Sequence, residues 1–224
     1  DIASTYGVSD VDHSSGTTTR YVQGRHYFEA PLATDRYTVV PGKGVTNLTE
    51  PTQFFTPGRG GWTTNEILRS LAARGEGTDV DANKDAAFGA IGNNRTVESH
   101  MFQIRDGLTA DIATVQWEAL SRTEFSVFVP LYSALLTEVS PYFSDLNCDE
   151  THQGPGQKDN VEWAMKEEPV NSLPFVLMDI NTLAYNNRST MAAGTRAYLD
   201  ALQAQIIDQQ EIVDGVMKNT PAGG

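Results

Sequence analysis

Residues 100–132 have the sequence HMFQIRDGLTADIATVQWEALSRTEFSVFVPLY, and this stretch decides the fold class. Three runs rich in β-branched and aromatic residues lie within it, at residues 101–105, 112–117 and 125–129. An Asp-Gly pair follows the first run, and Pro130 stops the third. Because the links between the runs are short, we expect an antiparallel meander with one buried face.

Helical patterns flank this meander. Residues 63–66, TTNE, form a capping box in which the first threonine caps the helix and the glutamate closes the box. Apolar residues at helical spacing follow at 67–72, and Gly75 suits the position just after a helix. Residues 171–187 and 191–218 each carry an apolar face and predict two amphipathic helices. Helices and an antiparallel sheet together predict the α+β class.

The rest of the chain has weaker patterns. The first sixty residues are rich in Ser, Thr, Gly and Tyr and show no helical period; residues 37–40 are their best strand candidate. We therefore predict one continuous segment with four parts: residues 1–60 irregular and β-rich, 61–144 a helix plus antiparallel strands, 145–160 a loop, and 161–218 helical.

Composition and charge argue against some classes of binding partner. The chain has 224 residues, with 16 Lys and Arg against 29 Asp and Glu, which gives a formal net charge of −13. Such a surface repels a phosphate backbone, and no basic cluster offsets it, so we expect no nucleic-acid partner. No apolar run is long enough to span a bilayer, so we expect no membrane contact from this segment. The single cysteine fits a cytoplasmic location, although an exported protein remains an alternative.

Residue chemistry alone reveals no complete active site. Cys148 precedes two acidic residues, which disfavour a reactive thiolate, so we interpret it as inert. The four histidines are scattered and form no zinc motif, so we expect no metal. Residues 79–85 place oxygen ligands at the alternate positions of a calcium loop. However, Lys84 replaces the turn glycine and Ala90 the closing glutamate, which favours a solvated acidic loop.

Four segments, taken in order, resemble PepD-type bacterial dipeptidases, a cysteine branch of the N-terminal-nucleophile hydrolases. They are residues 93–105 (NNRTVESHMFQIR), 115–119 (VQWEA), 122–132 (RTEFSVFVPLY) and 163–166 (WAMK). The resemblance covers residues 61–217 and is weaker before them. It implies one part of the four-layer αββα sandwich of that superfamily, an antiparallel sheet with helices packed on one face.

The resemblance also implies a mechanism and partners. In the family, an N-terminal cysteine attacks the dipeptide carbonyl and its own amino group acts as the base. This chain starts with Asp1, and its cysteine lies far downstream. We therefore expect the C-terminal part of a dipeptidase that is inactive alone, needs no metal or organic cofactor, and acts on dipeptides together with an N-terminal half. An uncovered sheet face also predicts self-association into a homo-oligomer.

The resemblance points to three candidate site residues. Residues 18–21 (TTRY) are the nearest match to a family segment that places an arginine beside the nucleophile, although the proline of that segment is missing. Arg20 would then pair with the thiolate or the substrate carboxylate; a plain surface arginine is the alternative. Asn94 and Arg95 are candidates for substrate binding, but for Arg95 we favour pairing with an acid such as Glu98.

Two other functions remain open. One is an amidase or acylase of the same superfamily, which acts on non-peptide amides. The other is a non-catalytic binding or assembly module whose partner is a separate chain.

Overall fold

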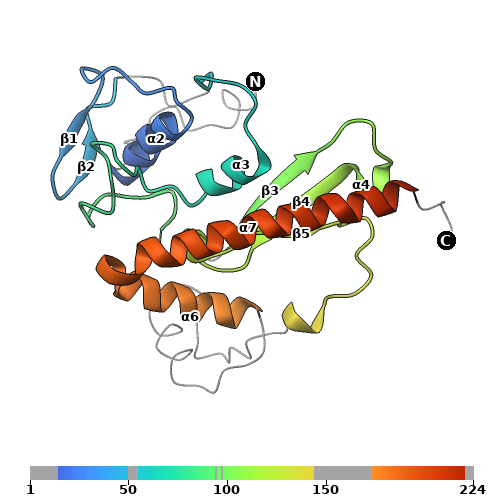
Figure 1. Ribbon diagram of the computed structural model, residues 1–224. Helices are drawn as coiled ribbons and strands as arrows, with labels where there is room; N and C mark the ends of the chain where they lie inside the picture. The colour runs from blue at the N-terminus through green and yellow to red at the C-terminus, as the bar shows by residue number, and fades with distance from the viewer. Residues whose placement is uncertain (1–14, 50–54, 94, 97, 144–172, 220–224) are drawn as a thin grey trace. The chain divides into compact units, whose positions relative to one another are not determined.

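The computed structural model describes residues 15–49, 55–93, 95–96, 98–143 and 173–219 (Figure 1). The chain divides into two compact units. The N-terminal unit comprises Asp1–Gly61 and Ala73–Ile91, and the sheet unit comprises Trp62–Ala72 and Gly92–Gly224. Helices and small antiparallel sheets occur together, which confirms the α+β class.

The N-terminal unit contains a helix that the sequence did not predict. Helix α2 spans Ser15–Tyr27, and strands β1 (Thr38–Val40) and β2 (Gly44–Thr46) pair antiparallel. The predicted strand is thus confirmed, whereas the prediction that this region lacks a helix was wrong. Thr18, Thr19 and Gln23 lie on the buried face of α2 together with Val22, so no apolar stripe marks the helix in the sequence.

Buried polar side chains attach α2 to the hairpin. The Thr18 hydroxyl donates to the Val45 carbonyl oxygen at 2.7 Å, and the Val45 N–H donates to the Thr19 hydroxyl at 2.8 Å. Val22, Val45 and Val80 belong to the small apolar core of the unit. Helix α2 is therefore held against the hairpin by hydrogen bonds to the backbone as well as by apolar burial.

The sheet unit is built on the predicted meander. Its elements are α3 (Thr64–Ser70), β3 (Ser99–Ile104), α4 (Ala110–Ala113), β4 (Thr114–Ala119), η1 (Thr123–Phe125), β5 (Val129–Leu131), η2 (Pro141–Phe143), α6 (Leu173–Asn186) and α7 (Arg188–Asn219). The strand order is β3-β4-β5, with both pairs antiparallel, which confirms the meander.

The third strand lies further along the chain than predicted. Residues 125–129 were expected to alternate, but Phe125, Val127 and Phe128 are all buried. The Gln203 side chain of α7 accepts from the Phe128 N–H at 2.6 Å and donates to the Phe128 carbonyl oxygen at 3.1 Å. A side chain of helix α7 thus forms the two backbone hydrogen bonds that an adjacent strand would otherwise form with Phe128. Pro130, predicted to stop the strand, lies inside β5 and pairs with Trp117 on β4.

The two faces of this sheet differ. Val115 and Trp117 of β4 are fully buried and pack with Leu68 of α3 and with Ile206 and Ile207 of α7. In Figure 1, α7 runs along the sheet and beside α6. On the other face of β3, the side chains of Phe102 and Ile104 are 55% and 79% exposed. Helices therefore cover one face, as predicted, while an αββα sandwich stays a prediction.

The predicted helices occur with adjusted ends. The capping box of α3 forms between Thr63 and Glu66, as predicted. However, α3 ends at Ser70, because the N–H groups of Leu71 and Ala72 bond carbonyl groups only three residues back, and Gly75 is not its cap. Helix α6 confirms the first C-terminal helix, and α7 confirms the second but begins earlier. Within the described residues, no helix is both long and apolar enough to cross a membrane.

Candidate functional site

The residues predicted from the resemblance lie in different parts of the structure. Arg20 is exposed on α2 in the N-terminal unit. Arg95 is exposed in the turn before β3 in the sheet unit, and its backbone N–H donates to the Asn93 side chain at 2.8 Å. Asn94 lies outside the described residues. So do Cys148 and the expected loop over residues 145–160.

The acidic loop that partly matches a calcium loop uses its carboxylates within the chain. Asp81 is buried and accepts from the N–H groups of Gly77 and Asn83 at 3.0 and 2.9 Å. Asp79 accepts from the Tyr37 hydroxyl at 3.0 Å. These bonds shape the turns after α3 and favour a structural role for the loop.

Asp79 also anchors a small polar cluster. Burial, and then the bond to Asp79, raise the pKa of Tyr37 to about 12. The His26 Nε2 atom lies 3.6 Å from an Asp79 oxygen. A hollow of about 80 Å³ beside His26 is also lined by Gln23, but its volume is well below that of ordinary ligand pockets.

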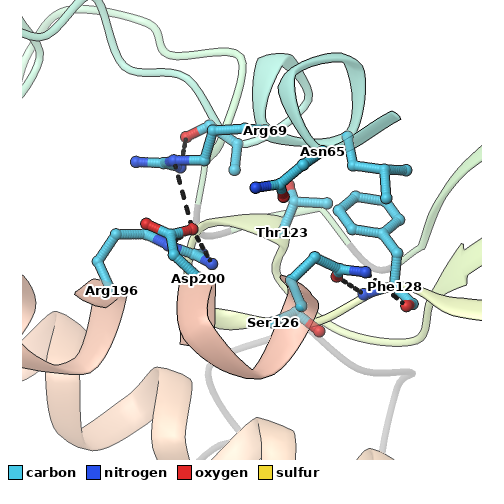
Figure 2. A pocket seen from close by; sticks show the side chains of 10 residues that line it. Asn65, Arg69, Thr123, Ser126, Phe128, Arg196 and Asp200 are labelled. Atoms are coloured by element: carbon cyan, nitrogen blue, oxygen red, sulfur yellow. Dashed lines mark hydrogen bonds and ion pairs between the residues drawn. The ribbon is translucent and has the colours of Figure 1, made fainter. Parts of the chain in front are cut away.

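Two arginines share one carboxylate in the sheet unit (Figure 2). Asp200 of α7 lies 2.7 Å from Arg196 Nη2 and 3.9 Å from Arg69 Nε on α3. Arg196 also donates to the Glu124 carbonyl oxygen in η1 at 2.5 Å. The cavity here, which Thr123 also lines, has a volume of about 10 Å³, room for one water molecule and not for a dipeptide. This cluster therefore joins α3, η1 and α7 and does not form a substrate pocket.

A second buried network fixes the C-terminal half of α7 to the sheet. Arg105 donates to Asp214, and both side chains are largely buried. Asp214 also accepts from the Tyr132 hydroxyl at 2.5 Å. Burial and this bond raise the pKa of Tyr132. Gln210 donates to both Tyr132 and Asp214.

An open groove lies beside this network. Its volume of about 470 Å³ is in the range of small-molecule pockets. Its walls come from the end of β5 and one face of α7, namely Pro130, Tyr132, Leu202, Gln205, Ile206, Gln209, Gln210 and Val213. The surface is mainly apolar, and the Tyr132 hydroxyl and the glutamine amides supply its hydrogen-bonding groups.

The third polar cluster lies on the sheet itself. The His100 Nδ1 atom of β3 is 2.5 Å from a Glu98 oxygen, and Glu98 also bonds Glu118 of β4. Burial raises the pKa of Glu118, and the bond with Glu98 adds to that rise. The bond with Glu98 also raises the pKa of His100. Burial alone would raise the pKa of Glu98, but its bonds to His100 and Glu118 lower it. Among the described residues the ion pair of Glu98 is with His100, and not with Arg95 as the sequence predicted.

Comparison with known proteins relates one segment of the chain to a peptidase family. Residues 74–166 match the sequence model of peptidase family C69. Dipeptidase A of Lactobacillus helveticus is 42% identical to the chain over 50 residues, a match that covers 22% of this chain and 10% of that protein. No solved structure matches the chain. Over this central segment the chain is related to the peptidases of family C69, which confirms the resemblance that the motifs indicated.

Sequence reasoning missed the three polar clusters of the sheet unit for a common reason. Arg196 and Asp200 show the helical four-residue spacing, and Glu98 and His100 the two-residue spacing of a strand. These local signals were available. The third member of each cluster comes from another element, and only the fold brings it close.

Proposed function

We propose that this chain is part of a bacterial cysteine dipeptidase, a hydrolase that cleaves the peptide bond of dipeptides. One observation carries the proposal: residues 74–166 match peptidase family C69, and a 50-residue match is to a protein named Dipeptidase A. Because that match covers 10% of Dipeptidase A, most of such an enzyme lies outside the matched part. The chain would supply scaffold and pocket wall.

In this proposal the catalytic sulfur lies outside the chain. Cys148 lies beside Asp149 and Glu150, and negative neighbours raise a thiol pKa and disfavour the nucleophilic thiolate. The nucleophile would instead be an N-terminal cysteine upstream, as in the family that the motifs resemble. The chain alone would then release no amino acids from a dipeptide, and no metal or organic cofactor would enter the hydrolysis.

The exposed face of the sheet favours a second layer of structure packed against it. Phe102 and Ile104 expose large apolar side chains on the face opposite α3 and α7. Large apolar side chains left exposed on a three-stranded sheet are typical of a face that another layer covers, and His100 and Glu118 form a polar edge of this same face. We propose that the N-terminal half of the same enzyme covers this face with a second sheet and completes an αββα sandwich. The isolated chain would then self-associate, which light scattering detects; a clean monomer would count against the covered face.

The substrate class is tested on the complete enzyme. Unmodified dipeptides and acyl amides are offered in parallel, and amino-acid release is measured. The proposal predicts turnover of dipeptides that exceeds turnover of acyl amides by at least about 100-fold. The reverse preference would make the protein an acylase, and turnover of neither class would favour the assembly module.

Arg20 offers a test at residue level. If Arg20 pairs with the thiolate or the substrate carboxylate, Arg20→Ala in the complete enzyme lowers kcat/KM by about 100-fold or more. Arg36, an exposed arginine of the same unit, is the matched control, and Arg36→Ala leaves kcat/KM unchanged. Equal turnover in both variants would make Arg20 a plain surface residue.

A further inference from the structure

A histidine and two glutamates meet at the start of the meander. Glu98 directly precedes β3, and His100 is the second residue of that strand. Residues two apart in a strand project to the same side of the sheet. Glu118 of β4 is the register partner of His100, so its side chain shares that side. The strand pairing itself therefore brings the three side chains together.

Their distances suit a single metal ion. One ligand atom from each of Glu98, His100 and Glu118 lies within 4.8 Å of the other two. Zinc binds histidine nitrogen and carboxylate oxygen at about 2.0–2.2 Å, so ligand atoms around a tetrahedral ion lie about 3.4 Å apart. His100 Nδ1 and the Glu98 oxygen lie 2.5 Å apart in a hydrogen bond, so metal binding would replace this bond and move the two atoms about 1 Å further apart.

The surroundings hold the ligands in place. The Glu118 residue is only 8% exposed, and Gln116 donates to its Oε2 atom at 2.7 Å. That bond orients the carboxylate in the way that outer partners orient metal ligands. The His100 ring rests against Phe102, with 5.3 Å between ring centroids. Two carboxylates this close repel each other when both are ionised, and a divalent cation between them removes that repulsion.

We propose that Glu98, His100 and Glu118 form a binding site for a divalent transition-metal cation such as zinc, with a fourth position open to water. The mixed nitrogen and oxygen ligands favour this class of ion over calcium or magnesium, which prefer oxygen ligands. The ion would tie the segment before β3 to β4. This role is structural and does not depend on the proposed peptidase activity.

Calorimetric titration of the metal-free chain with Zn²⁺ tests the site. We expect each chain to bind one zinc ion in a way that requires His100, with a dissociation constant in the micromolar range or below. Ca²⁺ and Mg²⁺ should bind at least ten-fold more weakly. His100→Ala and Glu98→Gln each weaken zinc binding by at least ten-fold. Both residues are exposed in the structure, so the variants keep the fold, which far-ultraviolet circular dichroism checks.

His26→Ala is the matched control. His26 also lies beside an aspartate, but in the N-terminal unit, so this variant binds zinc as the unaltered chain does. Substitution with Co²⁺ gives a second readout, because a tetrahedral site shows a strong visible band that His100→Ala abolishes. Absence of zinc binding, or equal binding by the His100→Ala variant and the unaltered chain, would overturn the proposal.

Discussion

The two units of the chain are stabilised in different ways. In the N-terminal unit the central side chain is a glutamine: fully buried Gln23 donates to carbonyl oxygens of Val80 and Gly89 at 3.0 and 2.9 Å. Its Oε1 atom accepts from the Ile91 N–H at 3.3 Å. In the sheet unit the centre is Trp117, fully buried among apolar side chains of the sheet and two helices.

This difference explains where sequence patterns succeed. Layers of apolar residues repeat with the period of their strand or helix, so the sheet unit is visible in the sequence. A buried polar residue that bonds the backbone of distant loops leaves no periodic pattern in the sequence. The fold of the N-terminal unit could therefore not be predicted from such a pattern. The contrast also predicts which substitutions damage each unit.

Trp117→Ala should have the largest effect. Removing this side chain leaves a cavity between the sheet and α7, and it orphans the Gln103 oxygen that accepts from the indole at 3.0 Å. We expect a loss of about 4 kcal/mol in the free energy of unfolding, measured by urea titration with circular dichroism. Phe102→Ala, on the exposed face of the same sheet, should cost under about 1 kcal/mol. Similar losses in both variants would refute the assignment of the two faces.

Asp214→Asn should rank second. The variant keeps the shape of the side chain but leaves Arg105 buried without its charge partner, at an expected cost of about 3 kcal/mol. Glu211→Gln removes an exposed charge one turn earlier on α7 and should change stability by less than about 0.5 kcal/mol. If both variants unfold at the same urea concentration, the Arg105–Asp214 pair does not hold α7 on the sheet.

Gln23→Ala tests the polar centre of the other unit. It leaves buried backbone groups near Val80 and Ile91 without their partner, and we expect a loss of about 2 kcal/mol. Hydrogen exchange should accelerate in residues 74–91, while β3–β5 keep their protection. Arg20→Ala, exposed on the same helix, is the control and leaves exchange unchanged. Unaltered protection in Gln23→Ala would show that apolar contacts alone hold the unit.

Tyr37→Phe should have the smallest effect, about 1 kcal/mol at neutral pH, through loss of the bond to Asp79. The folded pKa of about 12 exceeds the unfolded value near 10. The contribution of the hydroxyl is therefore fully present below pH 10 and is lost as pH rises through 12. The stability difference between the unaltered chain and the variant should shrink over that range in urea titrations. Tyr198→Phe, at an exposed tyrosine, should show no such trend.

Much of the sheet unit followed from its sequence. The meander, the capping box at Thr63 and both C-terminal helices were predicted, because each depends on residues close together in the chain. The position of β5 was not predicted, because Gln203, far along the chain, bonds the backbone of Phe128 where a neighbouring strand would otherwise do so. Helix α2 was missed because its buried face is largely polar.

The site was less predictable than the fold. Motifs within residues 93–166 indicated a resemblance that the family-model match over residues 74–166 supports, but the sequence did not predict that Glu118 lies opposite His100. That contact needs the strand register, which no single segment specifies. Arg20 and Arg95 remain predictions for function: both are exposed, and they belong to different units of the chain.

The most direct test of the proposed dipeptidase compares three samples for amino-acid release from dipeptides: this chain alone, the complete enzyme, and the complete enzyme with Cys148→Ala. We predict that the isolated chain is inert and that the other two turn over at equal rates, because the proposed mechanism uses a sulfur atom from another segment. Release by the isolated chain, or loss of turnover in the Cys148→Ala enzyme, would contradict the account.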